Sequence, residues 1–88
     1  MNKDFVNLLS EVLSDKLGDS KYKQYLPLDN LKSVVLEYIS KQMKEKNIKL
    51  SGAAIAKYNS MVKKCKKANE PLDFISAISE TMLSLQGF

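Results

Sequence analysis

The fold is decided by residues 51–67, which read SGAAIAKYNSMVKKCKK. Apolar and small side chains recur there every three or four residues, the spacing that aligns them along one face of an α-helix. Ser51 is a residue type that caps helix N-termini, and Leu50 can pack onto Ile55 as a hydrophobic staple. The spacing therefore predicts a helix that begins after Ser51 and ends near Ala68. Its predicted inner face consists of Ala54, Ile55, Tyr58, Met61, Val62 and Cys65.

Three further stretches carry the same helical period. They span residues 4–17, residues 29–46 with Asp29 or Asn30 as the N-cap, and residues 71–86, which open with a proline in the first turn. Their predicted apolar stripes are Phe5, Leu8, Leu9, Val12, Leu13 and Leu17; then Leu31, Val34, Val35, Tyr38 and Ile39; and finally Phe74, Ile75, Ile78, Met82 and Leu85.

The intervening residues 19–28 show neither a helical nor a strand period, and Pro27 biases the residue before it away from helix. We expect a long connection there. The chain has 88 residues and contains no alternating strand pattern and no internal repeat, so one domain over residues 1–88 is expected. The predicted fold class is all-α, a compact antiparallel four-helix bundle.

Composition argues against several classes of chemistry. The chain has no histidine, the usual general acid–base group and zinc ligand at neutral pH, and its one cysteine, Cys65, cannot form an internal disulfide or a thiolate metal cluster. We therefore expect a protein that is not an enzyme, with no cofactor, no metal and no small-molecule substrate. The opening residues lack the apolar core of a signal peptide, and no apolar run is long enough for a membrane span. The expected location is the cytosol.

Charge is distributed unevenly along the chain. The formal net charge is +4, and every basic residue is lysine. Residues 51–67 hold five lysines and no acid, whereas residues 68–88 hold three acids and no lysine. Because arginine supplies the planar fork that reads guanine and grips phosphate, its absence makes base-specific DNA recognition less favourable.

The lysines of residues 51–67 are the first candidate binding site. One interpretation is a platform for phosphates or for an acidic partner. The other is a solvated helix face whose charges complement the C-terminal dipole of the helix. A helix-turn-helix centred on Asn59 fails because Ile55 stands where that motif needs a small residue, so a continuous helix is predicted. The candidate residues are Lys57, Lys63, Lys64, Lys66 and Lys67.

Residues 28–85 resemble the immunity proteins of pediocin-like (class IIa) bacteriocins. The similar segments are NLKSVVLEYI at residues 30–39 with a lysine-rich continuation, SGAAI at residues 51–55 opening a second long helix, and a final helix over residues 72–85. The resemblance lies in helix lengths, polarity and lysine usage. It covers about two thirds of the chain.

The resemblance implies an antiparallel four-helix bundle in the cytosol that protects a bacteriocin-producing cell. Such a protein binds the mannose-phosphotransferase permease at the inner membrane face once the bacteriocin has engaged it, and so blocks the pore. Selectivity in that family is associated with the C-terminal half and its tail. The matching residues here are Leu85, Gln86 and Phe88.

Two alternatives remain open. A small nucleic-acid-binding or transcription-regulating protein, such as one of phage origin, would use the same lysines on phosphates. A structural adaptor or homodimer would instead use apolar side chains that lie off the main stripes. Those side chains are Leu36, Met43, Leu72 and Leu83.

Overall fold

A computed structural model describes residues 3–17 and 27–86, and no strand occurs in that part of the chain. The all-α prediction is therefore confirmed. Residues 18–26, which include most of the predicted connection, lie outside the described residues. The elements are α1 (Lys3–Glu11), the π-helix η1 (Val12–Lys16), α3 (Leu28–Glu45), α4 (Gly52–Lys67) and α5 (Pro71–Gln86).

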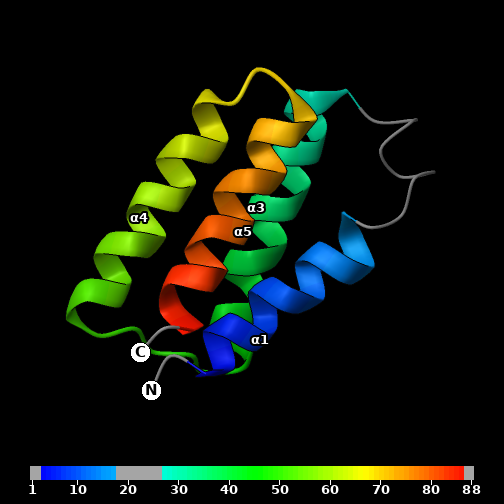
Figure 1. Cartoon of the computed structure of the whole chain (residues 1–88). Helices are drawn as coiled ribbons and strands as arrows, with labels where there is room; N and C mark the ends of the chain where they lie inside the picture. The colour runs from blue at the N-terminus through cyan, green and yellow to red at the C-terminus, as the bar shows by residue number, and fades with distance from the viewer. Residues whose placement is uncertain (1–2, 18–26, 87–88) are drawn as a thin grey trace.

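The helices lie against one another around one core (Figure 1). α4 and α5 lie side by side and run in opposite directions, joined by the short turn at residues 68–70, while α3 runs in the same direction as α5. α1 crosses obliquely and packs mainly on α5. The radius of gyration is 12.4 Å, close to the value of about 12 Å expected for a compact chain of this length. Among the described residues, no helix combines the length and apolar character that crossing a bilayer requires.

The buried residues are apolar, and the described part of the chain buries no polar or charged residue. The prediction that Val34 and Ile55 lie on the inner faces of their helices is wrong, because each is 45% exposed. Val34 precedes the buried Val35 and Ile55 follows the buried Ala54. One residue turns an α-helix by about 100°, which carries each side chain past the edge of the buried stripe. The core consists of Phe5, Leu8, Leu9, Val12, Leu17, Leu31, Val35, Ile39, Ala54, Met61, Cys65, Ala68, Phe74, Ala77, Ile78 and Leu85.

The first predicted helix changes its hydrogen-bond pattern halfway. After α1 the chain continues as η1, and the backbone N–H of Leu17 donates to the carbonyl of Val12 at 2.9 Å, five residues back. In a regular α-helix Leu17 would lie about 140° around the axis from Val12. The wider π turn returns it to the same side, so Leu17 is buried while Leu13 is half-buried.

The ends of the middle helices follow from local backbone chemistry. α3 begins at Leu28 with Pro27 as its N-cap, so the predicted caps Asp29 and Asn30 lie inside the first turn. The carbonyl of Pro27 accepts a hydrogen bond from the N–H of Leu31 at 3.0 Å. Proline suits the start of a helix because a backbone N–H at this position would have no partner within the helix. Ser51 is the N-cap of α4 as predicted, although its side chain makes no capping hydrogen bond.

Candidate binding surface

The predicted lysine site lies on α4, which is one continuous helix, as predicted. Lys63, Lys64, Lys66 and Lys67 are exposed, and Lys57 is half-buried. The side chain of Lys57 donates a hydrogen bond to the hydroxyl of Ser84 on α5. The lysine nearest the start of α4 thus joins two helices, and the four exposed lysines carry the surface charge.

The four exposed lysines point in three directions. Cys65 is fully buried, and a step of one residue turns the helix by about 100°. Lys64 and Lys66 therefore flank Cys65 on opposite sides, whereas Lys63 and Lys67 both lie about 160° from it. Of the four exposed lysines, Lys63 and Lys67 therefore share the outermost stripe of α4.

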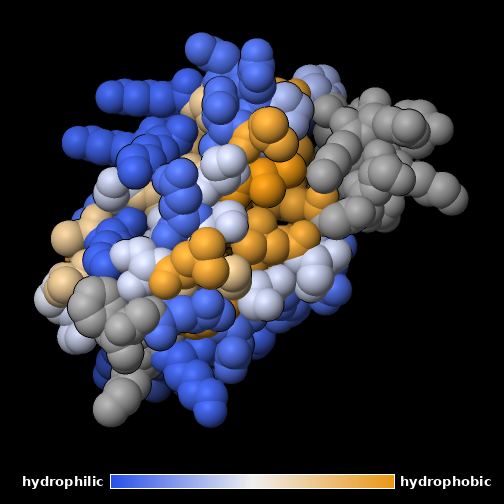
Figure 2. All heavy atoms as spheres, in the orientation of Figure 1, coloured by the Kyte–Doolittle hydropathy of each residue, from blue (hydrophilic) through white to orange (hydrophobic). Residues whose placement is uncertain are grey.

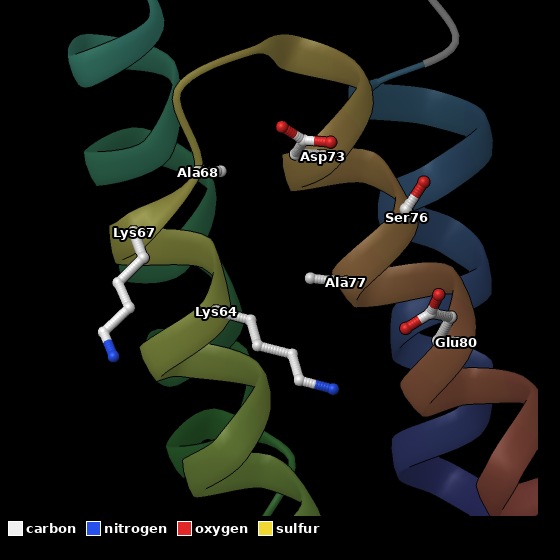
Figure 3. A pocket seen from close by; sticks show the side chains of 7 residues that line it. All are labelled: Lys64, Lys67, Ala68, Asp73, Ser76, Ala77 and Glu80. Atoms are coloured by element: carbon white, nitrogen blue, oxygen red, sulfur yellow. The ribbon is translucent and has the colours of Figure 1, made fainter.

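Lys64 lies in a groove between α4 and α5 (Figure 3). Asp73 and Glu80 of α5 line the same groove, and Lys64 points across it toward the side that carries Glu80. Lys67 borders the groove but points away from α5. Because the groove contains both signs of charge, it does not present the purely positive field that would concentrate anions.

Lys66 lies at the opposite groove, between α3 and α4, which it lines together with Lys32 of α3. The side chain of Lys32 is only 12% exposed, and its ammonium donates to the backbone carbonyl of Lys66 at 2.9 Å. A second contact of Lys32 is a long ion pair with Asp29, 3.9 Å between Nζ and Oδ1. Lys32 thereby satisfies one of the orphan carbonyls at the end of α4. Sequence reasoning missed this role because the two residues are remote in the chain.

The structure describes two of the three predicted residues at the C-terminal end. Leu85 is 4% exposed and belongs to the core, so its side chain is not available to a partner in this conformation. Gln86 is exposed at the end of α5. Phe88 lies outside the described residues. Of the three predicted tail residues, Gln86 is therefore the one that the structure describes as accessible.

Cys65 is an apolar core group, as predicted. Burial raises the pKa of its thiol from 9.0 to about 11, against a smaller opposing effect of the nearby Lys32 charge. The neighbouring lysines of α4 therefore do not activate it, because thiol reactivity requires an exposed, stabilised thiolate.

Tyr58 packs edge-on against Phe5 with ring centroids 5.7 Å apart.

Glu11 joins two helices through its side chain. Its carboxylate accepts a hydrogen bond from the hydroxyl of Tyr38 at 2.7 Å and lies 3.6 Å from Nζ of Lys46. The hydrogen bond to Glu11 is the main cause that raises the pKa of Tyr38. These contacts join the end of α1 to α3, and no spacing rule within one helix predicts them.

The largest exposed apolar side chains of α5 are Leu72 and Leu83, which are 71% and 58% exposed. Leu36 and Met43, suspected to share an apolar patch with them, are instead half-buried against the core. Figure 2 shows apolar surface gathered over α5, next to hydrophilic side chains that project from the neighbouring helix. The exposed leucines of the predicted set therefore belong to one helix.

Within residues 3–17 and 27–86, no three side chains of the metal-ligating types come together as a candidate metal site. No family model, curated protein or solved structure matches this chain.

Proposed function

We propose that this chain is a non-enzymatic cytosolic binding protein that contacts a protein partner through the outer stripe of α4. The observation that carries the proposal is the placement of Lys63 and Lys67. They lie one helical turn apart on the side of α4 opposite the core, are exposed, and form no ion pair with any residue that the structure describes. Two ammonium groups in these positions attract an acidic surface electrostatically. Added salt shortens the distance over which this attraction acts.

The most specific form of the proposal is an immunity protein of the pediocin-like type. It is supported by the order of the helices, by their lysine usage and by the opposite directions of α4 and its neighbours α3 and α5. We include in it the finer fold assignment, an antiparallel four-helix bundle whose first helix is tilted. The partner is then the bacteriocin-engaged mannose-phosphotransferase permease, approached by α4 and by the end of α5 at Gln86.

Expression in a bacteriocin-sensitive Gram-positive strain tests the proposal. The chain should protect the cells against at least one member of a broad panel of pediocin-like peptides. The double substitution Lys63→Gln/Lys67→Gln should reduce that protection. Lys41→Gln, at an exposed position of α3, is the matched control and should protect like the unmodified chain. Unchanged killing across the whole panel would remove the immunity function.

A nucleic-acid-binding function is the second candidate, and it is favoured by the absence of any acid in residues 51–67. It predicts binding to DNA or RNA whose affinity falls with salt. Each phosphate contact contributes about 0.9 to the log–log slope on duplex DNA, so Lys63→Gln/Lys67→Gln should reduce the slope by about 2. A chain that shifts neither DNA nor RNA at low salt excludes this candidate.

A further inference from the structure

The outer face of α5 carries a stripe that contains no charge. Leu72, Ser76, Ser79 and Leu83 follow one another at intervals of four, three and four residues. At about 100° per residue they fall within about 60° of arc, on the side of the helix opposite Phe74. Both leucines are mostly exposed, whereas Phe74 is fully buried. We call Leu72, Ser76, Ser79 and Leu83 the outer seam.

The outer seam is symmetric about its own midpoint. Leu72 and Leu83 lie equally far from the midpoint between Ala77 and Ile78, and so do Ser76 and Ser79. Two such helices in antiparallel orientation therefore match Leu72 with Leu83 and Ser76 with Ser79. This is the layer pattern of an antiparallel coiled coil with its 3–4 spacing. The small serines at the crossing point let the two backbones approach closely.

The flanks of the outer seam distinguish antiparallel from parallel pairing. Ile75 and Met82, both half-buried, lie on one side of it, about 80° from its centre. The charged groove between α4 and α5 lies on the other side. In an antiparallel two-fold pair each flank meets its own copy, so apolar side chains meet apolar side chains. A parallel pair would press the apolar flank of one copy against the charged flank of the other.

The charged flank is electrically balanced. Its groove is lined by the lysines Lys64 and Lys67 and by the acids Asp73 and Glu80. Two copies therefore bring equal numbers of both signs together at the rim, while the outer seam itself buries no charge. The centre of the interface is thus uncharged, with serines at the crossing point and leucines at the two ends of the seam, and charged side chains of both signs lie at its rim, where polar groups are common in protein–protein contacts.

We propose that the outer seam is the docking site for a second copy of this chain, which packs its own α5 antiparallel across a two-fold axis. The contact has the same surface on both sides, as a closed dimer requires. From Leu72 to Leu83 the seam spans about 16 Å, so the interface is small and belongs to the weak, concentration-dependent class. This assembly goes beyond the proposed binding function, which uses the outer stripe of α4.

Sedimentation at concentrations from micromolar to millimolar tests the dimer. The mass should rise from the chain mass of 9.9 kDa toward twice that value as concentration increases. Leu72→Lys and Leu83→Lys should each return it to the monomer value, because a lysine would meet the apolar seam of the second copy. Val34→Lys is the matched control, since Val34 is also exposed but lies on α3, and it should leave the dimer intact.

Disulfide formation tests the register without depending on lysine variants. Leu72→Cys and Leu83→Cys, prepared separately and then mixed under mild oxidation, should form a mixed disulfide. Leu72→Cys alone should not, because its two copies would lie about 16 Å apart, well beyond the reach of about 7 Å between bridged Cα atoms. Cys65 is fully buried and provides no competing thiol in the folded chain.

Three results would overturn the proposal. They are a monomer mass throughout the concentration range, a dimer that Leu72→Lys and Leu83→Lys leave intact, and rapid disulfide formation by Leu72→Cys alone. If the chain is monomeric, flotation with phosphatidylglycerol vesicles shows whether the outer seam binds lipid instead. Because these measurements involve neither bacteriocin nor α4 lysines, their failure leaves the proposed function standing.

Discussion

Asn47 ends α3 in a left-handed backbone conformation, with φ of 53°. The N–H of Ile48 donates to the carbonyl of Met43 at 2.9 Å, and the N–H of Asn47 donates to Lys44 at 3.2 Å. These two bonds form a Schellman motif, whose left-handed position favours glycine and tolerates asparagine. The motif satisfies two carbonyls at the end of α3 and turns the chain toward α4.

The effect of a substitution at Asn47 on stability should depend on the backbone conformation at this position. Side-chain contacts should matter less, since the residue is exposed. Asn47→Val should lower the free energy of unfolding by about 1–2 kcal/mol, because a β-branched side chain is strained at this φ, and Asn47→Gly should leave it equal or slightly higher. Urea unfolding measures both. Lys49→Val, at an exposed residue with ordinary φ, is the control and should change stability by less than about 0.5 kcal/mol. Equal effects at the two sites would contradict this account.

The Cys65 thiol makes stability sensitive to alkaline pH. Its pKa is raised from 9.0 to about 11 by burial, so the folded chain holds this proton more tightly than the unfolded chain. The resulting stabilisation is complete below pH 9 and is lost as pH rises through about 11, up to about 3 kcal/mol in total. Tyr38 and Tyr58, whose pKa values are also raised, act in the same direction.

Cys65→Ala isolates the thiol from the tyrosines. At neutral pH this substitution should cost about 1–2 kcal/mol because it removes a fully buried group. Between pH 9 and 11 the unmodified chain should lose stability faster, so the difference between the two proteins should shrink. Urea unfolding across that range measures the difference. Parallel pH curves would show that the thiol does not titrate as described.

At the scale of one element, η1 decides which leucine enters the core. Leu17→Ala should lower the free energy of unfolding by about 3 kcal/mol, because Leu17 is buried. Leu13→Ala should cost about 1 kcal/mol, because Leu13 is half-buried. In a regular α-helix Leu17 would lie further around the axis from Val12 than Leu13 does, about 140° against about 100°. A larger loss for Leu13→Ala in thermal or urea unfolding would therefore contradict the π turn.

At the scale of the whole molecule, the lysines differ in how much they contribute to the free energy of unfolding. Lys63→Gln/Lys67→Gln should change the free energy of unfolding by less than about 1 kcal/mol, since both side chains are exposed and only complement the helix dipole. Lys32→Gln should cost about 1–2 kcal/mol, because the mostly buried Lys32 side chain donates a hydrogen bond to the backbone carbonyl of Lys66 at the end of α4. Thermal unfolding at equal pH and salt compares them. If the double variant lost as much stability as Lys32→Gln, the outer lysines would have a structural role.

Much of the fold could be predicted because helical periodicity is a local property. All four helical segments are present, and the capping position of Ser51 is correct. The errors occur at residues whose burial depends on a neighbouring helix. Val34 and Ile55 sit at stripe edges, and whether an edge is covered depends on how close the next helix packs. The candidate site was predicted at the level of α4, but which of its lysines line a groove with a neighbouring helix follows from where α3 and α5 lie.

By itself, the sequence determined the helical class, the apolar core and the concentration of lysine in residues 51–67, because these depend on the order of residue types along one chain. Only the tertiary structure decided that Glu11 meets Tyr38, that Lys32 ends α4, that Leu85 is buried, and that Leu72 and Leu83 remain outside. Each of these depends on contacts between residues far apart in the chain. Such contacts are set by the packing of whole helices, which spacing within one helix does not encode.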